Sequence, residues 1–195
     1  MNPIYTVGHS NTPLESLGDL LAANDIALIV DVRSSPYSRY AVHFNRESLQ
    51  RYLETLGLRY VYMGRELGGH PDSPGFYDDE GYVRYDVIAS SPEFQEGIEK
   101  LLKGALHRKL AVMCSEEDPT NCHRRLLIAR VLRDRGATVL HLRADGRIQS
   151  EEDLQREETA QTGGQQSLFD DEEPRPWRST QSVTRRNPPE TSSLS

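Results

Sequence analysis

The amino-acid sequence predicts a single three-layer α/β domain with a mostly parallel sheet of about five strands, followed by a disordered C-terminal tail. Three observations support this prediction. Strand and helix patterns alternate through the first 145 or so residues, apolar runs mark the strands, and the composition changes near residue 150. We place the domain at residues 1–148 and the tail at 149–195. The predicted strands cover residues 4–7, 27–32, 59–63, 110–113 and 138–142.

The apolar runs and the residues between them justify these elements in order. The first run is closed by Gly8, and the second is interrupted only by Asp31, as is typical of strands that are buried on both faces. A helix follows each of the first four predicted strands or their loops, which is the pattern of a Rossmann-like sheet with right-handed crossovers. Thr12 and Glu15 form the expected capping box of the first helix. The other predicted helices cover residues 45–57, 91–104 and 122–135, and each has a glycine at or just after its end.

Two segments lack this periodicity. Residues 64–90 are rich in glycine, tyrosine and aspartate, and a long irregular segment of this kind in a compact domain is often a binding loop or lid. After about residue 150, glutamine, glutamate, serine, threonine and proline dominate. Such a composition buries too little apolar surface to fold by itself, so we expect residues 151–195 to be disordered or loosely attached.

Charge and composition exclude several function classes. The net charge is −7; residues 1–150 carry 18 basic and 20 acidic side chains, and residues 151–195 carry 5 and 10. A nearly neutral domain is unsuited to coating nucleic acid, although a local basic pocket is compatible with it. No apolar run approaches the length of a membrane span, and no secretory signal is visible, so we expect no membrane partner. With only two cysteines, a reducing cytoplasm is the expected location.

Unusual polar residues cluster where the predicted strands end. They occupy residues 8–11, 31–36, 114–119 and 122–124, and His141 lies at the end of the last strand. The carboxyl ends of parallel strands meet at one edge of a sheet, where ligands bind. We therefore expect these segments to form one site.

The basic residues near this edge suggest an anion site. Arginine placed beyond a buried strand can bind a phosphate or carboxylate, although Arg33 could instead form a structural ion pair with Asp31. Backbone N–H groups in the first turn of the helix that begins near Cys122 would favour an anion as well. The residues that we expect to bind the anion are Arg33, Arg124, Arg39, His43 and Ser10.

The segment from Cys114 to Arg124 has three interpretations. In the first, Cys114 or Cys122 is a nucleophile, His9 or His123 transfers a proton, and Glu116 acts as a base or orients a histidine. In the second, Cys114, Cys122 and His123 bind a metal, with a fourth ligand from His9, His141 or Glu116. The third makes both cysteines small buried hydrophobic residues. The paired spacing of structural zinc sites is missing, so we predict no metal site, and the sequence leaves any cofactor unknown.

Tyrosines are frequent between residues 37 and 85, and most of them are expected to be packing residues. The alternative is that some of them stack on a nucleic-acid base beside positive charge.

Several short sequence motifs, most of them in the polar segments at the strand ends, together resemble a prokaryotic family named domain of unknown function 488. The resemblance spans about residues 3–145, and His141 matches that family's histidine on its last strand. It implies an α/β domain in which these residues share a site, and it implies no particular reaction. The motifs are Gly8-His9-Ser10-Asn11, Asp31-Val32-Arg33 with Pro36, Phe44, Leu67-Gly68-Gly69, and Met113 to Glu116 through Cys122-His123-Arg124.

The tail contains a second resemblance. Residues 165–169, Gln-Gln-Ser-Leu-Phe, resemble the short peptide by which bacterial polymerases and repair proteins dock on the DNA sliding clamp. A flexible tail suits such a peptide, because it must fold onto its partner without constraint from a core. The partner-binding residues would be Gln165, Leu168 and Phe169.

Three functions remain open from the sequence. The first is an enzyme that acts on nucleotides or nucleic acid in DNA repair or replication, with an anion site at the strand ends. The second is a non-catalytic nucleotide- or DNA-binding module that is tethered to the sliding clamp. The third is a thiol redox or metal sensor.

Overall fold

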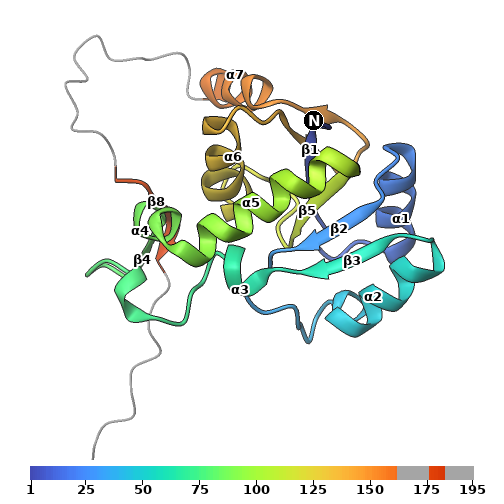
Figure 1. The fold of residues 1–195 in the computed structure, drawn as a ribbon, viewed down its shortest axis with the longest axis horizontal. Helices are drawn as coiled ribbons and strands as arrows, with labels where there is room; N and C mark the ends of the chain where they lie inside the picture. The colour runs from blue at the N-terminus through green and yellow to red at the C-terminus, as the bar shows by residue number, and fades with distance from the viewer. Residues whose placement is uncertain (162–175, 183–195) are drawn as a thin grey trace, which may run out of the picture.

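The computed structural model describes residues 1–161 and 176–182. Within these residues, six strands form a sheet in the order β3-β2-β5-β1-β6-β7, of which Figure 1 labels β3, β2, β5 and β1. All neighbouring strands are parallel except β7, which runs antiparallel to β6. The predicted α/β class and mostly parallel sheet are therefore confirmed, with β7 as an added short strand. The strands are β1 (Ile4–Gly8), β2 (Leu28–Asp31), β3 (Arg59–Tyr62), β5 (Leu110–Cys114), β6 (Val139–Leu142) and β7 (Ile148–Gln149).

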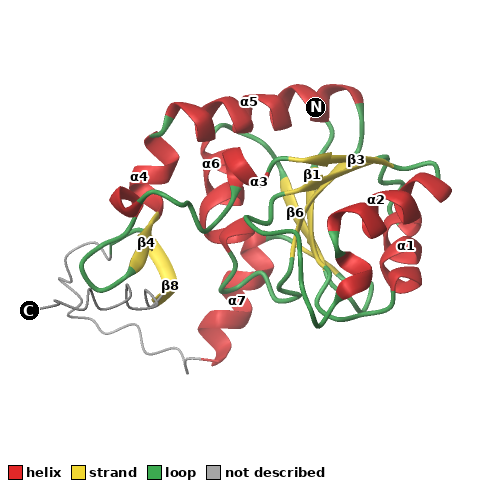
Figure 2. Cartoon of the chain, turned by 90° about the horizontal axis from the view of Figure 1, so that it is seen from below, coloured by secondary structure: helices red, strands yellow, loops and turns green. Residues whose placement is uncertain are grey.

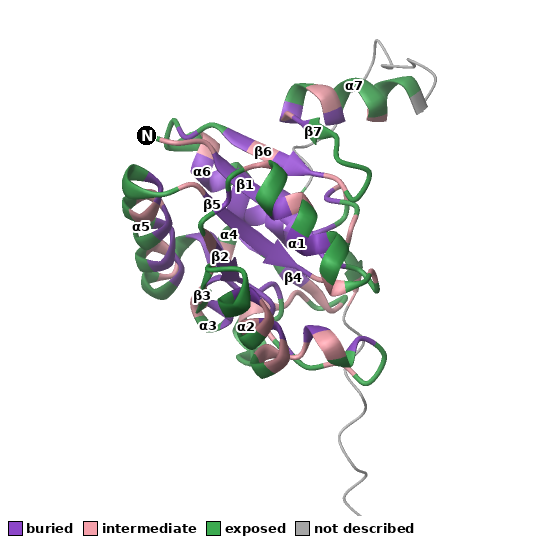
Figure 3. Ribbon diagram, turned by 90° about the vertical axis from the view of Figure 1, so that its right-hand side faces the viewer, coloured by how far each residue is buried: buried purple, intermediate pink, exposed green. Residues whose placement is uncertain are grey.

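Helices cover both faces of this sheet (Figure 2). Alternate residues of a strand point to opposite faces, so Leu110 and Val112 of β5 contact one apolar cluster while Ala111 and Met113 contact the other. The central strands are buried on both sides as a result (Figure 3). The first cluster includes residues of α5 (Pro92–His107) and α6 (Arg130–Asp134), and the second includes residues of α1 (Leu14–Ala23) and α2 (Arg46–Thr55).

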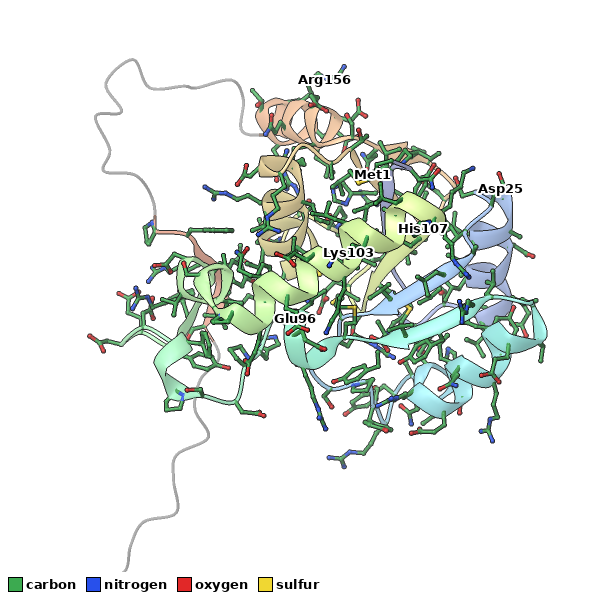
Figure 4. The ribbon with its side chains drawn as sticks, in the orientation of Figure 1. Met1, Asp25, Glu96, Lys103, His107 and Arg156 are labelled. Atoms are coloured by element: carbon green, nitrogen blue, oxygen red, sulfur yellow. The ribbon has the colours of Figure 1, made fainter. Side chains whose placement is uncertain are left out.

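Helix α5 begins where the sequence places its start. The side chain of Ser91 accepts a hydrogen bond from the Phe94 N–H, and Pro92 occupies the first turn. Phe94, Ile98 and Leu101 are buried against the sheet. The opposite side of the helix is polar and exposed, as Figure 4 shows for Glu96, Lys103 and His107.

Two predicted caps have other roles in the structure. Helix α1 begins at Leu14 without a side-chain cap, and the Thr12 hydroxyl instead donates to the carbonyl of His9 at 2.8 Å. Asn45 precedes α2, but its side-chain oxygen accepts from the Ser38 N–H at 2.7 Å. Both side chains therefore stabilise the loops that follow β1 and β2 rather than the helices.

The predicted helix 122–135 is not a regular α-helix. Residues Arg124–Ala129 form a π-helical segment, η3, which continues into α6. Such segments are rare and often lie at functional sites. Here the π-helical turns follow directly after Cys122 and His123.

The segment 64–90, predicted to be irregular, contains several short elements. They are α3 (Gly64–Leu67), η2 (Pro74–Phe76), β4 (Tyr82–Arg84) and α4 (Tyr85–Ser90); another short helix, η1 (Val42–Phe44), precedes α2. Strand β4 pairs antiparallel with β8 (Arg178–Ser182), a segment of the predicted tail (Figure 1).

The described parts of the tail are more ordered than its composition predicts. Helix α7 (Glu151–Gln161) contacts the domain through Leu154, which is buried, and through ion pairs from Arg125 to Glu151 and Glu158 at 2.7 and 2.6 Å. Specific partners on the domain surface thus compensate for a sequence with few apolar residues. The peptide Gln165 to Phe169 lies outside the described residues. None of the described helices combines the length and the hydropathy that crossing a bilayer requires.

Candidate functional site

The segments that follow β1, β2 and β5 meet at the carboxyl edge of the sheet. Strand β5 lies between β1 and β2, and backbone hydrogen bonds continue past the strand ends. The N–H groups of His9 and Ser10 donate to Cys114 and Ser115 at 3.1 and 2.7 Å, and that of Val32 donates to Met113 at 3.0 Å. The convergence expected from the sequence is therefore present for these three segments.

Arg33 and Asp31 form a buried ion pair at the end of β2. The Nε and Nη2 atoms of Arg33 donate to the two carboxylate oxygens at 2.9 and 2.6 Å, and Asp31 is fully buried. The Tyr60 hydroxyl donates to the same carboxylate at 2.7 Å, and burial with the Asp31 charge raises the pKa of that phenol far above its ordinary value. This is the ion pair that the sequence offered as the alternative to anion binding. It also orients the guanidinium rigidly.

His9 lies beside Arg33 and is neutral. Its Nε2 accepts a hydrogen bond from Arg33 Nη1 at 3.1 Å, its Nδ1 donates to the Ser10 carbonyl at 2.5 Å, and its ring stacks on Phe44 with centroids 4.1 Å apart. Burial and the Arg33 charge lower the pKa of His9 to about 4. Both ring nitrogens are occupied, so His9 positions Arg33 in this arrangement.

Two thiols, an imidazole and a carboxylate form a cluster behind this pair, which we call the thiol cluster: Cys114, Cys122, His123 and Glu116. The Cys114 and Cys122 thiols lie 3.0 and 3.2 Å from Oε2 of Glu116, to which they donate. The same sulfur atoms lie 3.6 and 3.9 Å from Nδ1 of His123. The cysteines and the histidine are at most 8% exposed, whereas Glu116 is exposed. The sequence placed these residues near one another, and the structure brings them into contact.

The two thiols are electrostatically inequivalent. A hydrogen bond donated to Cys122 and burial raise the pKa of the Cys114 thiol well above its ordinary value. Burial alone would also raise the pKa of Cys122, but hydrogen bonds with Cys114 and His123 hold it well below its ordinary value. The Cys122 thiol therefore gives up its proton more readily than the Cys114 thiol, to a base or to a metal ion.

Arg124 supports the loop that carries Glu116. Its guanidinium is fully buried and donates to the carbonyls of Glu116 and Glu117, the latter at 2.6 Å, while its Nε donates to the Thr6 hydroxyl at 3.3 Å. Gly8 makes the close approach of this loop feasible, because a Cβ atom there would lie 1.6 Å from the Glu116 carbonyl oxygen. Arg124 thus binds protein oxygens rather than facing solvent, so its guanidinium is not exposed to an anion in the pocket.

A pocket of about 290 Å³ opens in front of the Arg33–His9 pair. Tyr37, which is 55% exposed, lines it together with Glu116, so the pocket borders both an aromatic face and the thiol cluster. Ser10 adopts φ +47°, a left-handed conformation that is uncommon outside glycine and often marks functional loops. The residues of the pocket that bear on its chemistry are His9, Ser10, Arg33, Tyr37, Ser115 and Glu116.

The remaining candidate residues lie outside this pocket. Arg39 is exposed and does not line it. His43 packs against Phe44, and its Nε2 bonds to the Thr12 carbonyl at 2.9 Å. His141 is buried in β6, where its Nδ1 lies 2.7 Å from the Thr6 hydroxyl. Burial and then the Arg124 charge lower the pKa of His141 to about 3.

The segment 64–90 lines a second, larger cavity. Its volume is about 970 Å³, and acidic residues such as Asp72, Asp78 and Glu80 surround it together with His70 and Ser182. The same segment also closes over the thiol cluster, because a Cβ atom at Gly69 would lie 2.6 Å from Cγ of His123. We base no anion site on the larger cavity, since its walls are acidic.

Sequence reasoning missed two contributors to the site. Tyr60 was grouped with the packing tyrosines, although its hydroxyl completes the contacts of Asp31. Ser115 was not singled out, although it lines the pocket. In the β2–β3 register Asp31 pairs with Tyr62, which places β3, and with it Tyr60, beside Asp31. This strand pairing is not visible in the sequence, so the contact between Tyr60 and Asp31 could not be predicted.

Comparison with known proteins identifies a matching family. The family model described as "Domain of unknown function DUF488" matches residues 13–131, which include Arg33 and the whole thiol cluster. No curated protein matches the chain.

Proposed function

The chain belongs to the DUF488 family, and we propose that it is an enzyme that acts on a nucleotide or nucleic acid at the carboxyl edge of its parallel sheet. The observation that carries the proposal is a single pocket that combines Arg33 with the exposed ring of Tyr37 and borders the thiol cluster. Parallel α/β sheets bind their ligands at this edge.

Arg33 supplies the phosphate-binding group in this proposal. The hydrogen bonds to Asp31 and His9 use three of the five N–H groups of its guanidinium, which leaves one on each Nη atom for a ligand. Both partners hold the guanidinium in place before the ligand arrives, so little conformational entropy is lost on binding. The hydroxyls of Ser10 and Ser115 add neutral donors in the same pocket.

Tyr37 favours a nucleotide over a simple phosphate. Its hydroxyl donates to Glu47 at 2.8 Å, which fixes the ring while leaving it 55% exposed. A planar ring beside a fixed guanidinium suits a base that stacks and a phosphate that binds Arg33. In this arrangement Glu116, at the border of the pocket and the thiol cluster, is the group that would transfer a proton to or from the ligand.

Turnover and binding of defined ligands test the proposal. Purified protein is incubated with nucleoside mono-, di- and triphosphates and with short single-stranded DNA, and products are separated by chromatography. We expect one of these classes to be converted, and we expect Glu116→Gln to bind that class with little turnover. Binding without turnover in the wild type would support the non-catalytic module instead, and neither binding nor turnover would overturn both functions.

A matched pair of variants at Tyr37 tests the nucleotide assignment. Tyr37→Leu removes the stacking ring and should weaken binding about 5- to 150-fold, since stacking contributes about 1–3 kcal/mol per base. Tyr37→Phe keeps the ring and loses only the hydrogen bond to Glu47, so its affinity should stay close to that of the wild type. Equal affinities for the two variants would contradict base stacking on this residue.

We further propose a DNA sliding clamp as a partner of the tail peptide, on the sequence of residues 165–169 alone. Replacing both Gln165 and Phe169 with alanine should abolish binding to a purified clamp in a buffer of physiological salt and pH. Ser167→Ala, at a position that is not diagnostic of the peptide, is the control and should bind as the wild type does. A wild-type protein that does not bind the clamp would remove this partner.

A further inference from the structure

We propose that the thiol cluster binds one zinc ion through Cys114 Sγ, Cys122 Sγ, His123 Nδ1 and Glu116 Oε2. Ligand-type atoms of both cysteines and His123 lie within 4.8 Å of one another, and one carboxylate oxygen faces both sulfur atoms at 3.0 and 3.2 Å. Two thiolates and an imidazole are ligands that select zinc over magnesium or calcium.

The distances in the cluster agree with a tetrahedral site. Zinc–sulfur and zinc–nitrogen bonds of about 2.3 and 2.0 Å place the sulfur and nitrogen atoms of a tetrahedron about 3.6 Å apart. The observed separations between His123 Nδ1 and the two sulfur atoms are 3.6 and 3.9 Å. A sulfur–oxygen edge would be about 3.5 Å, close to the observed 3.0 and 3.2 Å. Glu116 lies outside the group whose ligand atoms are all within 4.8 Å of one another, so its exposed side chain must turn toward His123 Nδ1 to complete the site.

The second nitrogen of His123 is held as metal-binding histidines are held. Its Nε2 lies 3.2 Å from the Val32 carbonyl, which can only accept a hydrogen bond, so this nitrogen carries the proton. Once Nδ1 loses the proton through which it bonds Cys122, its lone pair is directed at the two sulfur atoms. Donation from the far nitrogen to a backbone carbonyl is a common support for a zinc ligand.

The surroundings of the cluster favour a metal ion over a nucleophilic cysteine. The two cysteines are 4% and 2% exposed, so a substrate in the pocket meets Glu116 before it meets either sulfur atom. The contacts described for the Glu116 carboxylate are the two thiols, and no arginine or lysine pairs with it among the described residues. Two thiolates side by side in a buried site would be stabilised by a bound cation.

The backbone around the cluster holds the ligands in place. Arg124 binds the carbonyls of Glu116 and Glu117, and the Gly69 backbone packs against the His123 ring. The position of Glu116 at the pocket wall would put the ion directly behind the proposed substrate site. Binding the ion through Oε2 alone leaves Oε1 of Glu116 free for the proposed proton transfer. The inference of zinc binding rests on the ligand geometry and does not require the proposed enzymatic function.

Metal analysis of the full-length protein tests the inference. The protein is purified without an immobilised-metal column, and zinc is measured by mass spectrometry together with titration of Zn²⁺ into chelator-treated protein. We expect one zinc per chain and loss of that zinc in Cys114→Ser and Cys122→Ser. Glu116→Gln should weaken zinc binding at least about tenfold, whereas Glu117→Gln, whose carboxylate pairs with Arg143 at 2.9 Å, should bind zinc as the wild type does.

Cobalt substitution of the wild type keeps the test decisive if a cysteine variant fails to fold. Co²⁺ should produce a thiolate-to-cobalt charge-transfer band and the visible bands of a tetrahedral site. Protein with no stoichiometric zinc and no such bands overturns the inference, as does a Cys114–Cys122 disulfide that forms in the presence of Zn²⁺. Unchanged zinc affinity in Glu116→Gln overturns the four-ligand site. Protein that binds zinc but no nucleotide would overturn only the proposed function.

Discussion

Arg33 Nη1 donates a 3.1 Å hydrogen bond to Nε2 of His9 and thereby joins the ends of β2 and β1 across the end of β5. Cys114, the last residue of β5, lies between the two joined strand ends. The same guanidinium is paired with Asp31, so one buried network fixes the segments at the ends of β1 and β2. This rigid network forms one wall of both the pocket and the thiol cluster.

The Asp31–Arg33 pair should be essential for stability. Asp31→Asn leaves a buried arginine without its charged partner, and the expected loss in the free energy of unfolding is about 3–5 kcal/mol. Urea denaturation measures this loss. Asp145→Asn is the control, because its pair with Arg147 is exposed and should contribute little. Similar losses for the two variants would show that the buried pair has no special role.

His141 should make the fold less stable in acid. Its pKa is about 3 in the folded protein and about 6.5 in the unfolded chain, so between these values the unfolded chain binds the extra proton. Stability should therefore decrease as the pH falls from about 6.5 to about 3, by up to about 1.4 kcal/mol per pH unit from this group.

The variant His141→Asn isolates this contribution. Asparagine can accept the hydrogen bond from the Thr6 hydroxyl but does not titrate in this range. Denaturation curves at several pH values should show a shallower acid dependence for the variant than for the wild type. Parallel curves would mean that His141 is not buried in its neutral form.

Gly69 should be required for the geometry of His123. A methyl group at this position would lie 2.6 Å from Cγ of the imidazole, so Gly69→Ala must displace the ring or the loop. We expect a stability loss of about 1–3 kcal/mol and weaker zinc binding. Gly75→Ala, where the nearest atom is 3.9 Å away, should change neither property. The two variants are compared by thermal denaturation and zinc titration, and wild-type zinc affinity in Gly69→Ala would contradict the packing argument.

Trp177 should anchor β8 to the domain. Its indole N–H donates to the Leu126 carbonyl at 2.7 Å, Arg130 lies over its ring, and its carbonyl accepts from the Tyr85 N–H at 3.0 Å. In Trp177→Ala the backbone amides of β4 should exchange faster with deuterium, because β8 is their pairing partner. Gln181→Ala, at an exposed position of β8, should leave this exchange unchanged. Equal exchange in both variants would show that other contacts hold β8.

The sequence predicts the fold well where burial is complete. The runs at β1, β2 and β5 are recognisable because both faces of these strands are buried, which makes nearly every side chain apolar. The order of the strands is not recognisable, because it depends on β5 entering between β1 and β2 from more than 70 residues away. Helix α7 is held on the domain by ion pairs with Arg125. The composition of the tail gives no information about this partner, so the sequence did not predict the helix.

The site is predicted in its location and only partly in its contacts. The strand ends converge as parallel topology requires, so His9, Arg33 and Cys114 were identifiable. The sequence did not predict where the Arg124 side chain points, because the residues after His123 form a π-helix rather than the predicted α-helix. The spacing of the cysteines also did not predict the proposed zinc site. Cys114 ends a strand and Cys122 precedes a helix, so an irregular loop brings them together.

A crystal structure with a bound nucleoside monophosphate tests the central claim most directly. The account predicts a phosphate oxygen within hydrogen-bond distance, about 3 Å, of an Arg33 Nη atom and a base on the ring of Tyr37. A nucleotide bound elsewhere, for example in the acidic cavity beside Asp78, would contradict it. So would the absence of binding at saturating ligand in a protein whose Arg33–His9 hydrogen bond is intact.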